Sequence, residues 1–314
     1  MTDTKKNDRI LLKEGVVSMN EINFTNCKEM ICEYGGSEKK KKIEYNNDLY
    51  LLKFPDPIRE KNLPLSYMNN VFSEYIGCKI FSSIGIPTQE VIIGTYDEES
   101  TIMPIKKKVV VACKDFTTNN TRLVEFSSLA NSITEVDKKF TTDIVDIYEV
   151  INRLNCDKKN MINKFWDMFV VDTLIGNVDR HLSNFGFIIT YNNIDFAPIY
   201  DCGSTLHPLL SDEKMKEIMK SETDFKNTVF SIYPVYKYDS KKLTYNEFYL
   251  KNINDLNDAL LRIYPKIDMS KINSIIDETP NMSGIRKEFL KKSILFRKEN
   301  ILEKAYKKLI KTSD

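Results

Sequence analysis

The first third of the chain alternates short apolar stretches with turn residues, a pattern typical of β-strands. Asn46-Asn47 and Gly35-Gly36 predict tight turns, because asparagine and glycine accept a positive φ at low cost. Pro55 and Pro57 end the strand before them, since proline cannot continue a ladder. The predicted strands are residues 28–34, 41–45, 48–54, 90–94 and 108–113, with a further hairpin turn at 97–100.

One helix interrupts this strand-rich region, at about residues 66–84. Its apolar positions recur at steps of three and four residues, which is the period of a helix with one buried face. These positions are Met68, Val71, Tyr75 and Cys78. The helix is expected to end at Gly85-Ile86-Pro87.

From about Phe116 the pattern changes to that of helices. Residues 160–175 are apolar on nearly all sides, which predicts a helix buried in a core. Residues 185–190 and 196–200 are predicted to be two strands of a hairpin. The tail, residues 285–310, is predicted to be a helix with one apolar stripe, made up of Leu290, Ile294, Ile301, Ala305 and Leu309.

Composition narrows the class of protein. The chain has 314 residues, of which 42% are apolar and 29% charged, as is usual for a globular protein. A net charge of +1 gives no reason to expect nucleic acid or an anionic membrane as a partner. The six cysteines form no C-x-x-C pair, which argues against a zinc site and a disulfide framework and predicts reduced thiols.

Targeting signals are also missing from the pattern. No apolar run reaches the roughly 18 residues of a membrane span. The polar N-terminus lacks the apolar core of a signal peptide. We therefore expect a cytoplasmic protein without a membrane span, and secretion by a non-classical route stays open.

The most informative chemistry lies in residues 175–186 and 197–203. Asp179 and Asn184 are five residues apart, the spacing of the Asp and the Asn in the catalytic loop of protein kinases. In such a loop the Asp accepts the proton of the substrate hydroxyl and the Asn holds Mg²⁺. Asp201, with a glycine two residues later, fits the role of the second magnesium ligand. The pattern predicts phosphoryl transfer from ATP.

Phosphoryl transfer also needs a lysine that contacts the nucleotide phosphates, and a carboxylate that holds this lysine in position. Lys53 lies on a predicted strand between apolar neighbours, and Glu74 lies 21 residues further on in the predicted helix. This layout suits an ion pair between strand and helix. The alternative is an edge-strand lysine and a solvated glutamate.

A phosphate-covering loop is expected just upstream of Lys53. Residues 35–43 lie between two predicted strands, where backbone N–H groups of a glycine-rich loop would face the phosphates. The candidate contacts are Gly35, Gly36, Ser37 and Lys39. The alternative is an ordinary charged hairpin, with the lysines at 39–42 mostly solvated.

Adenine is expected against residues 111–116, with Ala112 and Cys113 as candidate contacts. His181, two residues after Asp179, is a candidate catalytic residue that could contact the transferring phosphate; a structural role within the loop is the alternative. His207 is assigned no role.

These residues resemble those of the HipA-like serine/threonine kinases, a bacterial family with a protein-kinase-like fold. The family pattern Gly-Asn-x-Asp-x-His-x-x-Asn-Phe matches residues 176–185 at every defined position, and its Ala-Pro-x-Tyr-Asp segment matches 197–201. The family's phosphate loop is similar to residues 35–39, its strand lysine to Lys53 before Phe54-Pro55, and its helix start to residues 73–75.

The resemblance implies a bilobal α+β fold of the protein-kinase type. A small β-rich N-lobe would span residues 1–115 and a larger helical C-lobe residues 116–314, with ATP between them. It also implies an ATP- and magnesium-dependent serine/threonine kinase that acts on a protein hydroxyl and phosphorylates itself. Length and the many tyrosines and lysines are similar to those of a compact proinflammatory member, which implies virulence and delivery into host cells.

The chain departs from the family in two places. Only about 25 residues precede the first predicted strand, so an antitoxin partner and a toxin function are not expected. The family's inhibitory autophosphorylated serine corresponds to a position near Cys32, which cannot be phosphorylated in that way.

Two other functions stay open. One is a phosphoinositide-type lipid kinase, because Asp-Arg-His-x-x-Asn is also found in phosphoinositide kinases, and the other is a catalytically inactive interaction module. Retention of Lys53, Glu74, Asp179, Asn184 and Asp201 argues against the inactive module.

Overall fold

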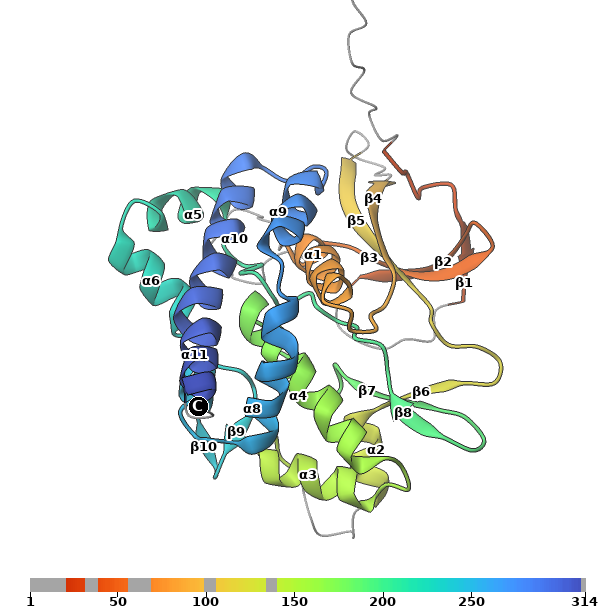
Figure 1. Cartoon of the computed structure of the whole chain (residues 1–314). Coiled ribbons are helices and arrows are strands. Elements are labelled where there is room, and N and C mark those ends of the chain that lie inside the picture. Colours follow the sequence, from red (N-terminus) through yellow and green to blue (C-terminus); the bar gives the residue numbers. More distant parts are fainter. Residues whose placement is uncertain (1–20, 32–38, 56–68, 99–105, 134–139, 312–314) are drawn as a thin grey trace, which may run out of the picture.

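The computed structural model describes residues 21–31, 39–55, 69–98, 106–133 and 140–311. They form a small part built on a five-stranded sheet and a larger, mostly helical part (Figure 1). The predicted α+β architecture with two unequal parts is confirmed. The division between residues 115 and 116 stays a prediction.

The sheet of the small part is antiparallel throughout. Its strand order is β1 (Lys28–Met30), β2 (Lys40–Tyr45), β3 (Asp48–Lys53), β5 (Lys106–Lys114) and β4 (Val91–Glu98). Asn46 and Asn47 have φ values of 50° and 66°, so β2 and β3 join through the predicted two-residue turn. The turn sets the register, which places Lys40 directly opposite Lys53.

Apolar side chains cover both faces of this sheet. The outer face carries a cluster made up of Phe24, Ile43, Tyr50, Leu52, Phe54, Val110 and Ala112. On the inner face, Val111 and Cys113 join the main core together with helix α1 (Asn70–Ser83). Alternate residues of β5 therefore serve opposite faces, as the two-residue period of a strand requires.

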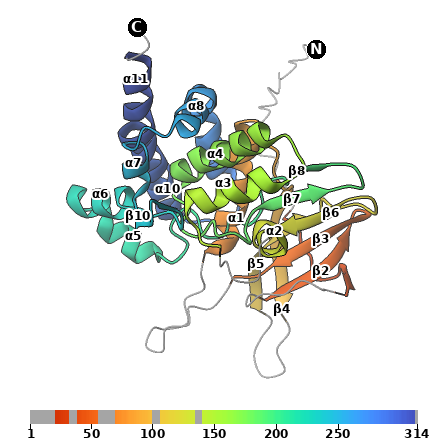
Figure 2. The ribbon, with the colours of Figure 1, turned by 90° about the horizontal axis from the view of Figure 1, so that it is seen from below.

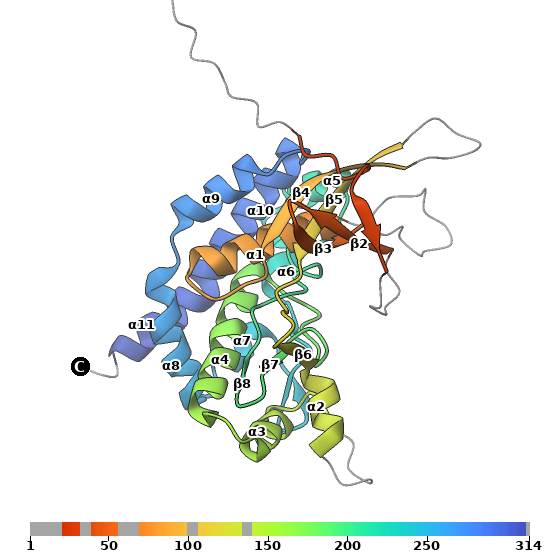
Figure 3. The same ribbon diagram turned by 90° about the vertical axis from the view of Figure 1, so that its right-hand side faces the viewer.

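Helix α1 follows the predicted span from Asn70 onward, whereas residues 66–68 lie outside the described part. Val71 and Cys78 are buried as predicted. Gly85 follows the helix with a φ of 86° and ends it where expected. Figure 3 shows α1 lying between the sheet and helix α9 (Met269–Glu278).

The turn predicted at residues 97–100 is wrong at its first two positions. Strand β4 continues through Asp97 and Glu98, which lie opposite Lys107 and Lys106. Opposite charges across an antiparallel pair stabilise a strand, so these acidic residues extend it. Residues 99 and 100 lie outside the described part.

The larger part carries the remaining described elements. Its helices and strands are β6 (Arg122–Glu125), α2 (Phe126–Ile133), α3 (Ile144–Arg153), α4 (Lys158–Ile175), β7 (Gly186–Ile189), β8 (Ile194–Phe196), α5 (Asp212–Ile218), α6 (Glu222–Phe230), β9 (Lys237–Tyr238), β10 (Lys241–Lys242), α7 (Tyr245–Phe248), α8 (Asn254–Ile263), α9, α10 (Gly284–Arg297) and α11 (Glu303–Lys311). Seen from below (Figure 2), α5 and α6 lie on the side away from the five-stranded sheet.

Helix α4 positions the loop that contains Asp179. It begins after Asp157, whose side chain accepts a hydrogen bond from the N–H of Asn160, and its buried residues lie on all sides, as predicted. Gly176 ends α4 with a φ of 66°, a left-handed conformation in which glycine avoids the strain of a side chain. The chain then enters the loop at the edge of the core.

Two further predictions need correction. The second hairpin strand is β8, which ends at Phe196, where a strand was predicted to begin; Ile199 forms only an isolated bridge with Thr88. The predicted tail helix is confirmed as α10 and α11, but five residues between them, Lys298–Leu302, form a π-helical turn. Within the described residues, no helix is both long enough and apolar enough to cross a membrane.

Candidate active site

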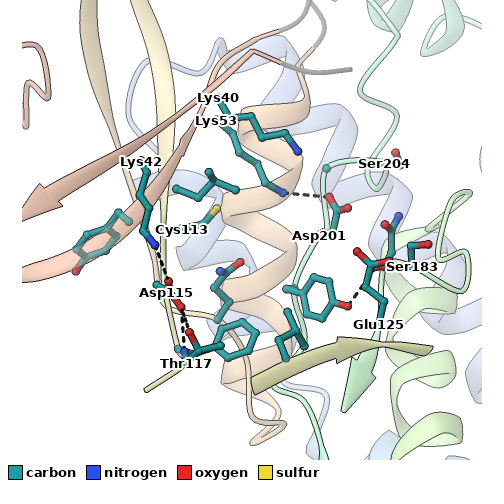
Figure 4. Close-up of a pocket in the computed structure, with 18 of the residues that line it drawn as sticks. Lys40, Lys42, Lys53, Cys113, Asp115, Thr117, Glu125, Ser183, Asp201 and Ser204 are labelled. Atoms are coloured by element: carbon teal, nitrogen blue, oxygen red, sulfur yellow. Dashed lines mark hydrogen bonds and ion pairs between the residues drawn. The ribbon is translucent and has the colours of Figure 1, made fainter. Parts of the chain in front are cut away.

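A cavity of about 770 Å³ lies between the five-stranded sheet and the loops of the larger part (Figure 4). This volume suits a nucleotide-sized ligand. Both parts of the molecule contribute to its walls. The residues that matter most to its chemistry are Lys40, Lys42, Lys53, Cys113, Asp115, Phe116, Thr117, Glu125, Asp179, His181, Ser183, Asn184, Tyr200 and Asp201.

Lys53 is held between two carboxylates at the centre of this cavity. Its Nζ lies 3.0 Å from Oε2 of Glu74 and 3.1 Å from Oδ1 of Asp201. Burial alone would lower the pKa of Lys53, but Asp201 and Glu74 raise it well above its usual value, so the amine stays charged. The predicted ion pair between strand β3 and helix α1 is therefore present, and Glu74 is not solvated, with 1% of its side chain exposed.

Asp201 combines an ionised carboxylate with an unusual backbone. The charge of Lys53 holds the pKa of Asp201 below its usual value. Its φ is 56°, in the left-handed region that costs non-glycine residues free energy and that recurs at functional sites. The side chain is 38% exposed, so a carboxylate oxygen is accessible to a ligand in the cavity.

The loop after α4 presents Asp179 and Asn184 to the same cavity. The backbone N–H of Asp179 donates to Oδ1 of Asn177 at 2.9 Å, and Nδ2 of Asn184 donates to the carbonyl of Asp179 at 2.7 Å. The second bond turns the amide oxygen of Asn184 away from that carbonyl. Burial raises the pKa of Asp179, and neighbouring Asp201 adds to the rise, while His181 opposes it.

Arg180 organises the candidate site through its contacts, and the sequence pattern did not point to it. It is fully buried and pairs with Asp172 of α4, with its Nε 3.0 Å from Oδ2. Its Nη1 donates to the backbone carbonyls of Asn184 and Asp201, each at 3.0 Å, and to that of Tyr200. One guanidinium thus ties together the backbones of the two candidate magnesium ligands. Asp172 is the one charged residue in the apolar final turns of α4, residues 168–175, and this was the signal that could have revealed the pair.

The two histidines differ in their surroundings, since only His181 lines the cavity. His181 lines the cavity, with its Nε2 3.9 Å from Oδ2 of Asp179, and its Nδ1 accepts a hydrogen bond from the N–H of Ser183 at 3.3 Å. Both of its predicted roles are compatible with this position. His207 packs against Phe289, and burial together with nearby Arg297 lowers its pKa to about 3, so it is neutral.

The predicted nucleotide contacts are only partly brought to the cavity. Gly35, Gly36 and Ser37 lie outside the described residues. Lys39 pairs with Glu98 and lies over the ring of Phe54, on the outer face, so the structure does not bring it to the cavity. Instead Lys40 and Lys42 line the cavity. Lys39 and Lys40 face opposite sides because side chains alternate along β2, and the role of residues 35–37 as phosphate contacts stays a prediction.

The same alternation separates Ala112 from Cys113. The side chain of Ala112 belongs to the outer cluster, whereas Cys113 lines the cavity. The segment after β5 adds Asp115, which accepts hydrogen bonds from the N–H of Thr117 at 3.0 Å and from its Oγ1 at 2.6 Å. The next residue, Phe116, places its ring 6.1 Å from that of Tyr200. These residues line the cavity, and the position of adenine against them stays a prediction.

The donor set fits Mg²⁺ held together with phosphates. Among the described residues, no group of three or more His, Cys, Asp or Glu could hold a metal ion. Asp201 and Asn184 supply one carboxylate and one amide, both oxygen donors, and both line the cavity. Mg²⁺ commonly binds proteins through one or two such ligands, with phosphates and water completing its shell.

The close packing of α1 against the loop after Asp201 gives a test. A Cβ on Gly77 would lie 2.7 Å from the Cβ of Cys202, so Gly77→Ala must push the helix and the loop apart. We expect a loss of about 1–3 kcal/mol in the free energy of unfolding, measured by urea denaturation. As a control, Gly284→Ala meets no described atom within 4 Å and should leave stability unchanged or slightly raised. Equal stability of Gly77→Ala and the unmodified protein would contradict this packing.

Comparison with known proteins places this geometry in a family. Residues 32–278 match the family model described as the HipA-like C-terminal domain. The chain is 41% identical over 304 residues to the serine/threonine-protein kinase CtkA of Helicobacter pylori (strain J99), an alignment that covers 94% of this chain and 90% of that protein.

Two solved structures share the fold. A crystal structure of a Helicobacter pylori proinflammatory kinase CtkA matches with a TM-score of 0.84 and 40% identity, and covers 94% of this chain and 99% of that one. HipA from the toxin–antitoxin complex of Shewanella oneidensis MR-1 with HipB and operator DNA matches with a TM-score of 0.51 and 16% identity, over 90% of this chain and 68% of that one. The second match shows the fold alone.

The architecture is therefore the bilobal, protein-kinase-like one that the residues predicted. The chain belongs to the family of HipA-like C-terminal domains. The matched segment contains every predicted site residue from Gly35 to Asp201.

Proposed function

We propose that this protein is an ATP- and magnesium-dependent protein serine/threonine kinase that also phosphorylates itself. The observation that carries the proposal is the arrangement of Lys53 between Glu74 and Asp201 in the cavity that Asp179 and Asn184 also line. These side chains come from a strand, a helix and two loops, and together they supply the groups that phosphoryl transfer requires. The 41% identity to a protein named a serine/threonine-protein kinase supports the same activity.

Each side chain has a proposed role. Lys53, aimed by Glu74, contacts the nucleotide phosphates. Asp179 orients the substrate hydroxyl and accepts its proton, which its half-exposed position at the cavity permits. Asp201 and Asn184 hold Mg²⁺, which when bound neutralises charge on the phosphate oxygens. His181 either contacts the transferring phosphate or orders the loop.

The nucleotide would enter between the sheet and the loops. We propose that adenine lies against Cys113 and the segment from Asp115 to Thr117, and that the backbone of residues 35–37 covers the phosphates. The side chain of Ala112 faces the outer cluster, so only its backbone remains a candidate contact.

The activity is tested by incubating the full chain with Mg²⁺ and γ-labelled ATP, alone, with a generic basic protein, and with phosphoinositide vesicles. Label on serine or threonine, mapped by mass spectrometry, is the expected result. Label only on lipid would replace the proposal with a lipid kinase. No label and no nucleotide binding would leave an interaction module. The Asp179→Ala variant controls for a contaminating kinase.

Non-classical secretion and a role in virulence are proposed on the resemblance to the Helicobacter pylori protein alone. Finding the protein in the cell-free culture medium, with a cytosolic marker absent, would support them. Strict retention inside cells would contradict them.

Lys53 and Glu74 should behave as one unit in kinetics. Lys53→Ala is expected to lower kcat/KM about 10²–10³-fold, because it removes a preorganised cation from the phosphates. Glu74→Ala should have a milder effect, since Asp201 still contacts Lys53. The double variant should be little worse than Lys53→Ala alone, because residues that act together are not additive. Cleanly multiplicative losses would mean that the two side chains work independently.

A further inference from the structure

Lys40 and Lys53 form a pair of like charges on the wall of the cavity. They lie directly opposite each other on the antiparallel strands β2 and β3, so both side chains project from the same face. Both line the cavity. Figure 4 shows the Lys40 side chain running alongside that of Lys53, in the direction of Asp201.

The charges around Lys53 bear on what a second lysine in this cavity could do. Lys53 contacts two carboxylates, Glu74 and Asp201, so these three groups together carry one net negative charge. On its own this cluster does not attract a polyanion. Lys42, two residues along β2, pairs with Asp115 at 3.5 Å, and this places its charge at the adenine end of the cavity. Lys40 adds its positive charge at the end where Lys53 and Asp201 lie.

We propose that Lys40 is a second binding residue for the polyphosphate of the nucleotide, acting beside Lys53. Like charges directly opposite each other on a sheet repel, and an anion between them converts that repulsion into two attractive contacts. This inference rests on the proposed nucleotide site. It adds to that site a residue on strand β2 that holds the phosphates, besides the phosphate-covering loop proposed upstream of it.

The neighbouring residue on β2 supplies a matched control. Lys41 points to the opposite face, where its Nζ contacts Glu29 and donates to the hydroxyl of Tyr96 at 2.7 Å. Lys41→Met removes the same charge from the same strand without reaching the cavity. Lys40→Met keeps most of the aliphatic stem and removes only the cation, and Lys40→Arg restores it.

The test measures the binding of ATP, ADP, AMP and adenosine to the full chain by calorimetry at fixed Mg²⁺. Lys40→Met should weaken ATP binding about tenfold, ADP binding less, and AMP and adenosine binding hardly at all, as a partly exposed charged contact would. Lys41→Met should bind all four ligands as the unmodified protein does, and Lys40→Arg should recover most of the loss.

The outcomes separate this inference from the proposed function. If the unmodified protein binds ATP and Lys40→Met binds it equally well, Lys40 has no role and the kinase proposal stands. Equal weakening of ATP and adenosine would show that Lys40 shapes the wall instead of holding phosphates, and would overturn the inference. If the unmodified protein binds none of the four ligands, the proposed function fails and the inference fails with it.

Discussion

Asp179→Ala is expected to lower the rate of phosphoryl transfer by about 10²–10⁴-fold, the usual effect of losing a general base. The affinity for ATP should remain nearly unchanged, because the proposed contacts of Asp179 are with the substrate hydroxyl. Single-turnover assays with labelled ATP measure the chemical step, and calorimetry measures nucleotide binding. Asp179→Asn, which keeps the shape and removes the charge, should be almost as slow.

Two comparisons make this result specific. Asp195→Ala removes another partly exposed carboxylate of the larger part, one that pairs with Lys164 at 2.6 Å and does not line the cavity, and it should retain full activity. If Asp179→Ala retained more than about a tenth of the activity, the assignment of Asp179 as the general base would be contradicted. A parallel loss of ATP affinity would instead indicate that the loop had collapsed.

The strand pattern predicted the sheet well because its signals are local. Two adjacent residues, Asn46 and Asn47, are enough to form the turn. Once the turn has formed, β2 and β3 can pair in only one register. Residues 160–175, which are apolar on nearly all sides and became most of α4, were equally clear, since this stretch is longer than a strand. The errors lie where distant segments decide the structure. Asp97 and Glu98 would suit a turn, but lysines opposite them in β5 extend the strand.

Residue spacing predicted the members of the candidate site but not the direction of every side chain. The amine of Lys53 lies within 3.1 Å of a carboxylate oxygen of both Glu74 and Asp201, although Asp201 is 148 residues further along the chain. By contrast, Lys39 and Lys40 are indistinguishable in a run of four lysines. Only the register with Lys53 shows that Lys40 lines the cavity and Lys39 does not.

The role of Arg180 could not be read from spacing either, because its partners are backbone carbonyls contributed by two loops. Those carbonyls belong to Asn184, Tyr200 and Asp201. Sequence patterns record side-chain types, whereas this contact depends on where the two loops meet. The buried pair with Asp172 means that Arg180 cannot leave without stranding a charge in the core. The geometry of the candidate metal ligands is thus anchored to helix α4.

Asp201→Asn should abolish most magnesium-dependent turnover, by about 10²-fold or more, while Asn184→Ala should be less severe. The difference follows from charge, because a carboxylate is an anionic ligand for a hard cation and an amide offers only a dipole. Asparagine is the better replacement at residue 201, since it tolerates the φ of 56° that alanine would resist.

A second measurement distinguishes loss of a metal ligand from general damage. In the unmodified protein Asp201 lies 3.1 Å from Nζ of Lys53, so it would compete with a nucleotide phosphate for that cation. Asp201→Asn removes the competition, so its affinity for ATP in the presence of a chelator should equal or exceed that of the unmodified protein. Titration with Mg²⁺ should then strengthen ATP binding in the unmodified protein far more than in the variant. If Asp201→Asn kept the full magnesium dependence, the metal would have to be held by other residues, and the proposed role of the Asp201 carboxylate would be withdrawn.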